Sequence, residues 1–178
     1  MDLREKIRSV PHWPIDPVTF RDITTLLQDP EAFKWSCDKF YDRYKDMGVE
    51  KVVGIDARGF LFGAVLAYKL DVGFTPVRKK GKLPPPVVSQ EYTLEYGSSI
   101  VEISRDGIRQ GEKVVIVDDL IATGGTASAA VNLVEKMGGQ ILECAFVIDP
   151  GCIDKHHRTQ RQQFHGLFHR VGGGAGLV

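Results

Sequence analysis

The segment Val115–Ala127, which reads VIVDDLIATGGTA, constrains the fold of this chain more than any other stretch. With Val114 it begins in an unbroken VVIV run, a pattern typical of a strand buried on both faces. Two carboxylates follow, then a short loop rich in Gly and Thr, and then the apolar pattern of a helix. A buried strand that leads directly into a helix predicts an α/β protein.

The rest of the chain repeats this alternation. Short β-rich runs predict strands at 51–55, 74–78, 114–117 and 140–149. Apolar residues spaced by three and four predict helices at 59–70 and 123–137, and a longer helix that starts after the cap Asp29 and stops at Gly48. Residues 1–9 form a further helix candidate, and three prolines then predict an extended, loop-like passage. We therefore expect a mostly parallel central sheet with helices on both faces.

One segment departs from this rhythm. Residues 92–103 alternate apolar and polar side chains around a Gly-Ser-Ser turn, which predicts a β-hairpin inserted between strands of the parallel sheet. A basic, proline-rich loop at 78–86 precedes it. A long polar loop that emerges from a sheet strand is a candidate lid.

Composition narrows the class of protein. The 178 residues hold 23 Lys and Arg against 23 Asp and Glu, so the chain lacks the basic footprint of a duplex-DNA binder. No apolar run is long enough to span a membrane, and the first ten residues lack the apolar core of a secretory signal. Cys37, Cys144 and Cys152 have no zinc-site spacing and predict reduced thiols. We expect a single-domain cytoplasmic protein that binds neither nucleic acid nor membrane.

The loop after the buried strand has the chemistry of an anion site. Free backbone N–H groups and the dipole at the start of a helix attract a phosphate. Gly124 and Gly125 allow close backbone approach, and Thr123 and Thr126 add hydroxyl donors. The carboxylates before the loop would repel a phosphate, so they suit sugar hydroxyls, the water shell of a metal, or positive charge developing at a sugar carbon. No GxxxxGK[ST] motif occurs, which disfavours a P-loop nucleotide hydrolase.

These residues resemble the 5-phosphoribosyl 1-diphosphate (PRPP) signature of the type I phosphoribosyltransferases. Four other stretches narrow the resemblance to the adenine-specific members: FRDIT at 20–24, DARGFLFG at 56–63, RKKGKLP at 78–84 and YTLEYG at 92–97. The motifs stand in family order over residues 20–149. The resemblance implies a single type I phosphoribosyltransferase-like domain with a small N-terminal hood (1–28), a core (29–149) that carries the hairpin and flexible lid, and an atypical C-terminal tail (150–178).

The resemblance also implies roles for individual residues. The 5′-phosphate would be held by Ala122, Thr123, Gly124, Gly125 and Thr126, and the ribose by Asp118, Asp119 and Tyr96. The diphosphate would be held by Arg58, Arg78, Lys79 and Lys82, partly from the neighbouring subunit of a homodimer. Phe20 would stack on adenine, and the backbones of Thr19 and Arg21 would read the edge of the base. Glu95 matches the catalytic glutamate of the family.

The implied reaction transfers the phosphoribosyl group from PRPP to adenine, giving AMP and diphosphate in purine salvage. It passes through an oxocarbenium-like sugar, and Glu95 either stabilises this cation or relays a proton. The implied cofactor is Mg²⁺, bound mainly through the PRPP diphosphate and the ribose hydroxyls rather than at a metal site of the protein.

The chain departs from the family pattern at three places. Pro84–Pro86 stiffens the predicted lid where members continue with Gly, and Pro150 stands where a Leu helps to sandwich the base. Residues 151–178 have little family likeness and gather four histidines without zinc-site spacing, which predicts a polar tail.

Two alternatives remain at this stage. The first is a phosphoribosyltransferase for another base, such as hypoxanthine or xanthine. The second is a PRPP-sensing transcription regulator, which would need a DNA-binding module that about twenty residues before FRDIT are too few to supply.

Overall fold

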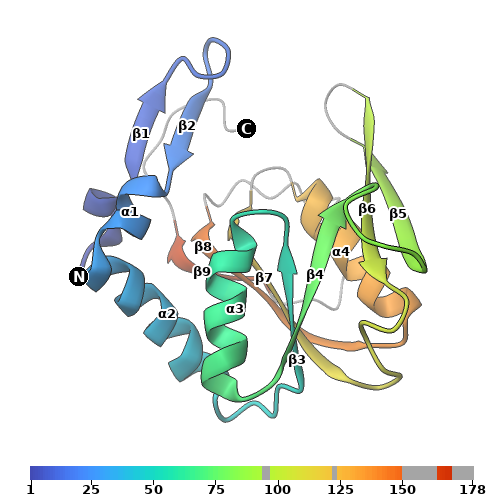
Figure 1. Ribbon diagram of the computed structural model, residues 1–178. Helices are drawn as coiled ribbons and strands as arrows, with labels where there is room; N and C mark the ends of the chain where they lie inside the picture. The colour runs from blue at the N-terminus through green and yellow to red at the C-terminus, as the bar shows by residue number, and fades with distance from the viewer. Residues whose placement is uncertain (94–96, 122–123, 150–163, 170–178) are drawn as a thin grey trace.

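The structure is a computed structural model that describes residues 1–93, 97–121, 124–149 and 164–169. A seven-stranded sheet forms its centre, with the strand order β5-β6-β4-β3-β7-β8-β9. Helices cover both faces of this sheet, and a two-stranded hairpin rises above one end of it (Figure 1). The predicted α/β class is confirmed.

The central sheet is mostly parallel. Its strands are β3 (Lys51–Ile55), β4 (Gly73–Lys79), β5 (Val87–Thr93), β6 (Ser98–Ser104), β7 (Lys113–Leu120), β8 (Gln140–Asp149) and β9 (Phe164–His169). Strand β3 pairs in parallel with β4 and β7, and β8 pairs in parallel with β7 and β9. Strands β5 and β6 form the predicted inserted hairpin, and β6 joins it to β4 in antiparallel register.

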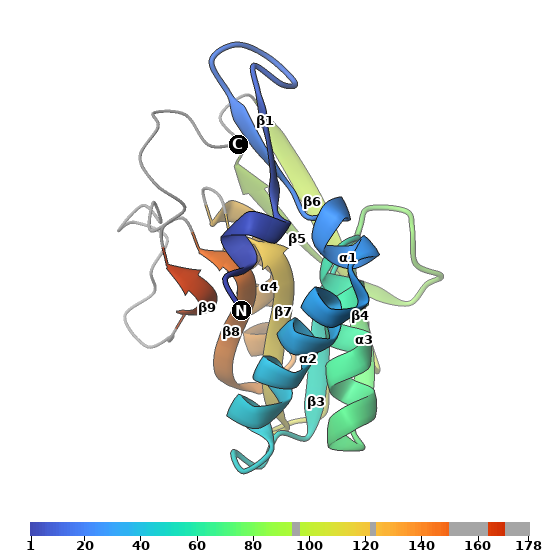
Figure 2. The same ribbon diagram turned by 90° about the vertical axis from the view of Figure 1, so that its left-hand side faces the viewer.

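The helices lie in two groups. On one face, α2 (Pro30–Tyr44) packs on α3 (Gly59–Leu70), which contacts β3 and β7. On the other face, α4 (Gly125–Lys136) contacts β8 and the β5–β6 hairpin. Figure 2 shows α2 and α3 side by side, with the N-terminal 3₁₀ helix η1 (Leu3–Lys6) and α1 (Thr24–Gln28) above them. None of the described helices has the length and apolar character needed to cross a membrane.

The VVIV run of β7 supplies both cores, as its sequence predicts. Val114 and Ile116 pack in the cluster beneath α4, whereas Val115 and Val117 pack in the cluster beneath α2 and α3. All four are fully buried. Because the strand is fixed from both sides, the residues at its end are held in place.

The start of α2 also agrees with the sequence. The Asp29 side chain accepts hydrogen bonds from the amides of Glu31 and Ala32, both at 3.0 Å, and Pro30 occupies the first turn. The helix ends at Tyr44, earlier than predicted, and turns lead on to Gly48 at φ +66°. Gly48 therefore lies in the turns that follow α2 and does not end the helix itself.

Two predictions about the ends of the chain were wrong. The expected helix over 1–9 is a single turn, after which β1 (Arg8–Pro11) pairs with β2 (Thr19–Asp22). The prolines led to the prediction of a loop instead of this hairpin. An edge strand nevertheless tolerates a proline, which has no N–H to donate. The predicted polar tail also contains β9, which adds a parallel strand beside β8.

Candidate active site

A cavity of about 370 Å³ lies between the sheet and the β1–β2 hairpin. It opens at the carboxyl ends of β3 and β7, the place where open α/β sheets bind ligands. Its lining is Trp13, Pro14, Phe20, Ile55, Asp56, Ala57, Arg58, Lys79, Tyr92, Val101, Asp118, Asp119, Leu120 and Thr126. Six of the predicted site residues therefore meet in one cavity.

A smaller cavity of about 100 Å³ adjoins it at the start of α4. Gly124, Gly125 and Thr126 line it, together with Asp118 and Leu120. Gly124 has φ +88°, a conformation that L side chains rarely adopt, which explains the glycine. The cavity therefore faces the free N–H groups of a twelve-residue helix, an arrangement suited to a phosphate.

The acidic pair stands where β7 ends. Asp118 is half-buried and Asp119 is 3 % exposed, and the Asp119 amide donates to Asp118 Oδ1 at 2.8 Å. Burial raises the pKa of Asp118 well above its ordinary value, and the neighbouring Asp119 charge raises it further. Burial also raises the pKa of Asp119, while Arg58 opposes that shift. Both carboxylates thus lack the hydration they would have in water, and sugar hydroxyls would restore hydrogen bonds to them.

Arg58 links the acidic pair to the aromatic wall of the cavity. Its Nε lies 2.8 Å from Asp119 Oδ2, and its guanidinium carbon lies 5.4 Å from the centre of the Phe20 ring. The guanidinium therefore contacts both a carboxylate and an aromatic ring. A diphosphate in the cavity would compete with Asp119 for this cation.

The basic turn at residues 79–82 meets the cavity on its other side. Lys79 lines the cavity, whereas Lys82 is exposed and outside the lining. Arg78 Nε lies 3.1 Å from Asp56 Oδ2, so Arg78 is engaged with a wall residue. Of the four predicted diphosphate ligands, the structure brings Arg58 and Lys79 into the cavity and leaves Arg78 and Lys82 at its edge.

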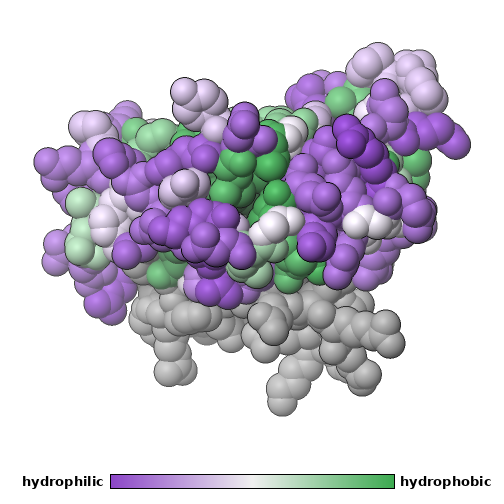
Figure 3. Space-filling model, turned by 90° about the horizontal axis from the view of Figure 1, so that it is seen from below, coloured by the Kyte–Doolittle hydropathy of each residue, from purple (hydrophilic) through white to green (hydrophobic). Residues whose placement is uncertain are grey.

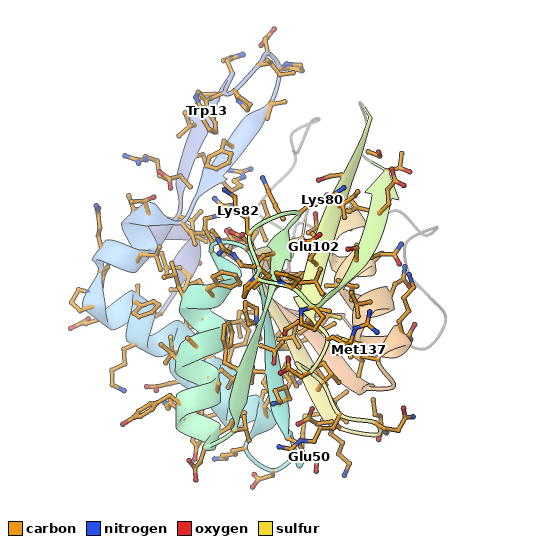
Figure 4. The ribbon with its side chains drawn as sticks, turned by 45° about the vertical axis from the view of Figure 1, so that its right-hand side comes forward. Trp13, Glu50, Lys80, Lys82, Glu102 and Met137 are labelled. Atoms are coloured by element: carbon orange, nitrogen blue, oxygen red, sulfur yellow. The ribbon has the colours of Figure 1, made fainter. Side chains whose placement is uncertain are left out.

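The hairpin β1–β2 forms the roof. The Trp13 ring contacts Phe20 edge to face, with centroids 4.6 Å apart and an interplanar angle of 74°. Thr19 and Arg21 flank Phe20 in β2 and pair with Pro11 and Ser9. Figure 4 shows Trp13 in this hairpin and Lys80 and Lys82 beyond the end of β4, with Glu50 at the opposite end of the molecule.

Sequence reasoning missed several lining residues. Trp13 is 51 % exposed, and a tryptophan in a proline-rich loop is the signal that could have found it. Asp56 and Leu120 lie within the motifs DARGFLFG and VIVDDLIATGGTA, but no role is predicted for either of them from the sequence. The predicted Glu95, Tyr96, Ala122 and Thr123, with Pro150, lie outside the described residues.

The described residues include no group of three or more His, Cys, Asp or Glu placed to hold a metal. Asp118 and Asp119 nevertheless offer carboxylate oxygens to the cavity, the donor type that Mg²⁺ prefers. This donor set fits a magnesium ion that is held chiefly by its substrate.

A second cleft, of about 340 Å³, lies at the other end of the sheet and is lined by Glu50, Lys51, Gly73 and residues 109–112. Lys51 Nζ and Glu112 Oε1 are 3.5 Å apart there. Figure 3 views this end from below and shows hydrophilic side chains on either side of a hydrophobic strip. None of the predicted site residues that the structure describes lines this cleft.

Comparison with known proteins agrees with this geometry. Residues 23–168 match the family described as "Phosphoribosyl transferase domain". The adenine phosphoribosyltransferase of Desulfosudis oleivorans is 64% identical over 149 residues, which are 84% of this chain and 86% of that protein.

Solved structures of the same family are also similar. Adenine phosphoribosyltransferase from Thermoanaerobacter pseudethanolicus superposes with a TM-score of 0.89 at 40% identity, covering 94% of this chain and 98% of that one. The enzyme from Saccharomyces cerevisiae, complexed with an imino-altritol bisphosphate and adenine, gives 0.86 at 35% identity and covers 94% and 97%. By its motifs, its fold and these relatives, the chain belongs to the adenine phosphoribosyltransferases.

Proposed function

We propose that this chain transfers the 5-phosphoribosyl group of PRPP to adenine, giving AMP and diphosphate for purine salvage. The observation that carries the proposal is the pair of adjoining cavities that brings together a helix start suited to an anion, an acidic pair, a cation and an aromatic wall. These are the complements of a phosphate, a ribose, a diphosphate and a purine. Membership of the family and the adenine bound in the yeast relative support the same substrate pair.

The residues at the end of β7 would hold the sugar. Gly124, Gly125 and Thr126 would bind the 5′-phosphate, and Asp118 and Asp119 would accept hydrogen bonds from the ribose hydroxyls. Binding at two points fixes the sugar so that its C1 faces the base, which converts a bimolecular reaction into an effectively unimolecular one. Burial of the carboxylates strengthens their attraction for the positive charge that develops on the sugar.

The cations would take the leaving group. When the bond between C1 and the diphosphate oxygen breaks, the electron pair leaves with the diphosphate, and Arg58 and Lys79 would stabilise that charge. The N9 lone pair of adenine then forms the new glycosidic bond from the opposite face, and N9 loses its proton. We assign catalysis to Glu95, which would either stabilise the sugar cation or relay the proton that N9 loses. We also propose that Tyr96 contacts the ribose.

Mg²⁺ bound to PRPP would supply Lewis acidity to the leaving group. Asp118 and Asp119 would hold its hydration shell or the ribose hydroxyls that it shares. The chain's own contribution is to place these oxygens on a strand end that is packed from both sides.

The base would lie against Phe20. We propose that adenine replaces the Arg58 guanidinium on this ring and that the backbones of Thr19 and Arg21 read the edge of the base. Arg58 is then free to meet the diphosphate, so the same movement opens the base site and completes the leaving-group site.

We also propose a homodimer, on the evidence of α3. This helix is apolar on its outer side as well as on its buried side, since Leu61 is 44 % and Tyr68 is 86 % exposed. The two residues are seven positions apart and therefore share one face, along with exposed Ala64. A second copy of the chain would cover this face. A cytoplasmic location and the one-domain organisation inferred from the sequence remain proposals too.

An assay of PRPP with adenine, guanine, hypoxanthine and xanthine in parallel tests the function. We expect diphosphate release and nucleotide formation with adenine at least about 100-fold faster than with the oxopurines. A site that pairs with the donors and acceptors of adenine would leave some of its own polar groups unpaired against an oxopurine. Preference for an oxopurine would favour the phosphoribosyltransferase for another base. Tight PRPP binding without turnover would favour the regulator.

A further inference from the structure

The turn formed by Lys79, Lys80, Gly81 and Lys82 rests on a buried carboxylate that the reaction described above does not use. Glu102 on β6 is 6 % exposed, and its Oε2 accepts a hydrogen bond from the Gly81 amide at 2.8 Å. Its Oε1 accepts from the Ser89 hydroxyl at 3.3 Å. Figure 4 shows Glu102 close below Lys80 and Lys82, where β4 leads into the turn.

The register of the sheet places Glu102 at the centre of this arrangement. Glu102 lies directly opposite Arg78 on β4 and opposite Ser89 on β5, so the three side chains share one face. Its neighbours Val101 and Ile103 point to the other face and join the core beneath α4. An apolar side chain at position 102 would avoid the desolvation of a carboxylate, so its presence calls for a reason beyond packing.

The partners of the carboxylate suggest that reason. Among the described residues, Glu102 forms no ion pair, and its contacts are with neutral donors. The turn above it carries Lys79, Lys80 and Lys82 directly after Arg78, so four positive charges stand within five residues. A negative charge beneath them offsets their mutual repulsion and draws the turn toward the sheet.

Other contacts connect the turn that Glu102 holds to the cavity. The Lys80 amide donates to the Ile100 carbonyl at 3.0 Å, and Arg78 Nη1 donates to the Lys82 carbonyl at 3.1 Å. Arg78 also reaches Asp56 on the cavity wall, and Lys79 lines the cavity itself. The turn is thus tied to β6 on one side and to the cavity on the other.

We propose that Glu102 is a positioning residue, which holds the basic turn in the conformation that presents its cations to the diphosphate of PRPP. This inference rests on the proposed function. It assigns the orientation of the leaving-group site to a residue outside the cavity and outside the motifs that marked the family.

Glu102→Ala and Glu102→Gln test the role by binding calorimetry with diphosphate and with AMP. We expect Glu102→Ala to weaken diphosphate binding at least about tenfold and to leave AMP affinity unchanged, because AMP lacks the diphosphate. Glu102→Gln keeps an oxygen that accepts the Gly81 N–H but removes the negative charge, so its diphosphate affinity should lie between those of the parent and Glu102→Ala. A purely structural role would lower both affinities together, and that result would overturn the proposal.

Gly81→Ala tests the same hydrogen bond from its exposed end. A Cβ at Gly81 would meet nothing within 4 Å, so the fold should survive, but φ is +78° there and the turn must shift. We expect this variant to reproduce the selective loss of diphosphate binding. The losses in the double variant should be less than additive, since both changes break one contact.

Glu112→Ala is the matched control. Glu112 is also a buried glutamate that accepts a backbone hydrogen bond, from the Arg109 amide at 2.9 Å, but at the far end of the sheet. It should lower stability without changing the ratio of diphosphate to AMP affinity. If the parent chain binds no diphosphate, the proposed function fails. If the parent binds it and folded Glu102→Ala binds it equally well, the positioning role alone fails.

Discussion

At the scale of single residues, the acidic pair shows a conflict between binding and stability. Asp118 and Asp119 are adjacent carboxylates that share a mostly dry site, and one of them has a cation beside it. Two ionised carboxylates at this distance repel each other, so the unliganded protein holds them at a free-energy cost. The ligand hydroxyls that they would bind offset that cost.

Asp118→Asn should therefore raise the melting temperature while it weakens PRPP and AMP together. The folded-state pKa of Asp118 lies above its ordinary value of 3.8, so the unfolded chain ionises first as pH rises, and stability falls from that pH upward. We expect a gain on the order of 1 kcal/mol at pH 7, or about 2–4 °C in Tm. The gain should vanish below about pH 4, where both states are protonated. A variant that is less stable than the parent at pH 7 would contradict this account.

Glu95→Gln separates catalysis from binding. The substitution keeps the size of the side chain and removes its charge, so turnover should fall about 100-fold or more while the dissociation constant of PRPP changes little. Single-turnover measurements give the rate of the chemical step directly. An unchanged rate in those measurements would remove Glu95 from the reaction.

At the scale of elements, the strongest sequence patterns gave the most reliable predictions. The bounds of α3 and β8 match the predicted 59–70 and 140–149, since each has a continuous apolar pattern between clear turn residues. The β1–β2 hairpin was missed because its residues are polar or proline-rich, and β9 was missed because its six residues FHGLFH stand in a segment rich in polar residues. Both become strands through pairing with a neighbour. The same distinction holds for the site residues. Arg58 and Asp119 could be predicted because they lie in motifs, whereas Trp13 lines the cavity only because of where the β1–β2 hairpin lies.

The contact between α3 and β7 gives an element-scale prediction. A Cβ at Gly59 would lie 2.6 Å from the Val117 carbonyl oxygen and 2.9 Å from Asp118 Oδ1. Gly59→Ala must push the start of α3 away from the acidic pair, so we expect a loss of about 1–3 kcal/mol in stability and weaker AMP binding.

Gly63→Ala is the control for that prediction, because it lies one turn further along α3. Its Cβ would meet the Phe74 ring at 2.9 Å, away from the carboxylates. It should destabilise the protein without changing the affinity of the folded protein for AMP. Denaturation and calorimetry on both variants make the comparison, and equal AMP affinities would show that α3 does not set the position of Asp118.

At the scale of the whole molecule, the outer face of α3 exposes the apolar side chains Leu61 and Tyr68. The chain has no net charge, so no overall repulsion opposes the approach of a second copy to the outer face of α3.

Tyr68→Lys should dissociate the proposed homodimer. In a twofold interface each change occurs twice, so burying two lysines should raise the dimer dissociation constant about 30-fold or more. Sedimentation velocity over a range of concentrations measures it. Met47→Lys, at another exposed apolar residue beyond α2, is the control and should leave the mass unchanged. A parent chain that sediments as a monomer at all concentrations would refute the interface.

The edge-to-face contact between Trp13 and Phe20 makes the base site visible to spectroscopy. Indole emission depends on the polarity and the aromatic groups around the ring, and a purine on Phe20 would arrive within the environment of Trp13. The chain has two tryptophans, and Trp35 lies in α2, on a different element. Trp35→Phe would therefore leave one intrinsic fluorophore at the roof of the cavity, so that the arrival and departure of adenine could be followed in stopped flow without a label.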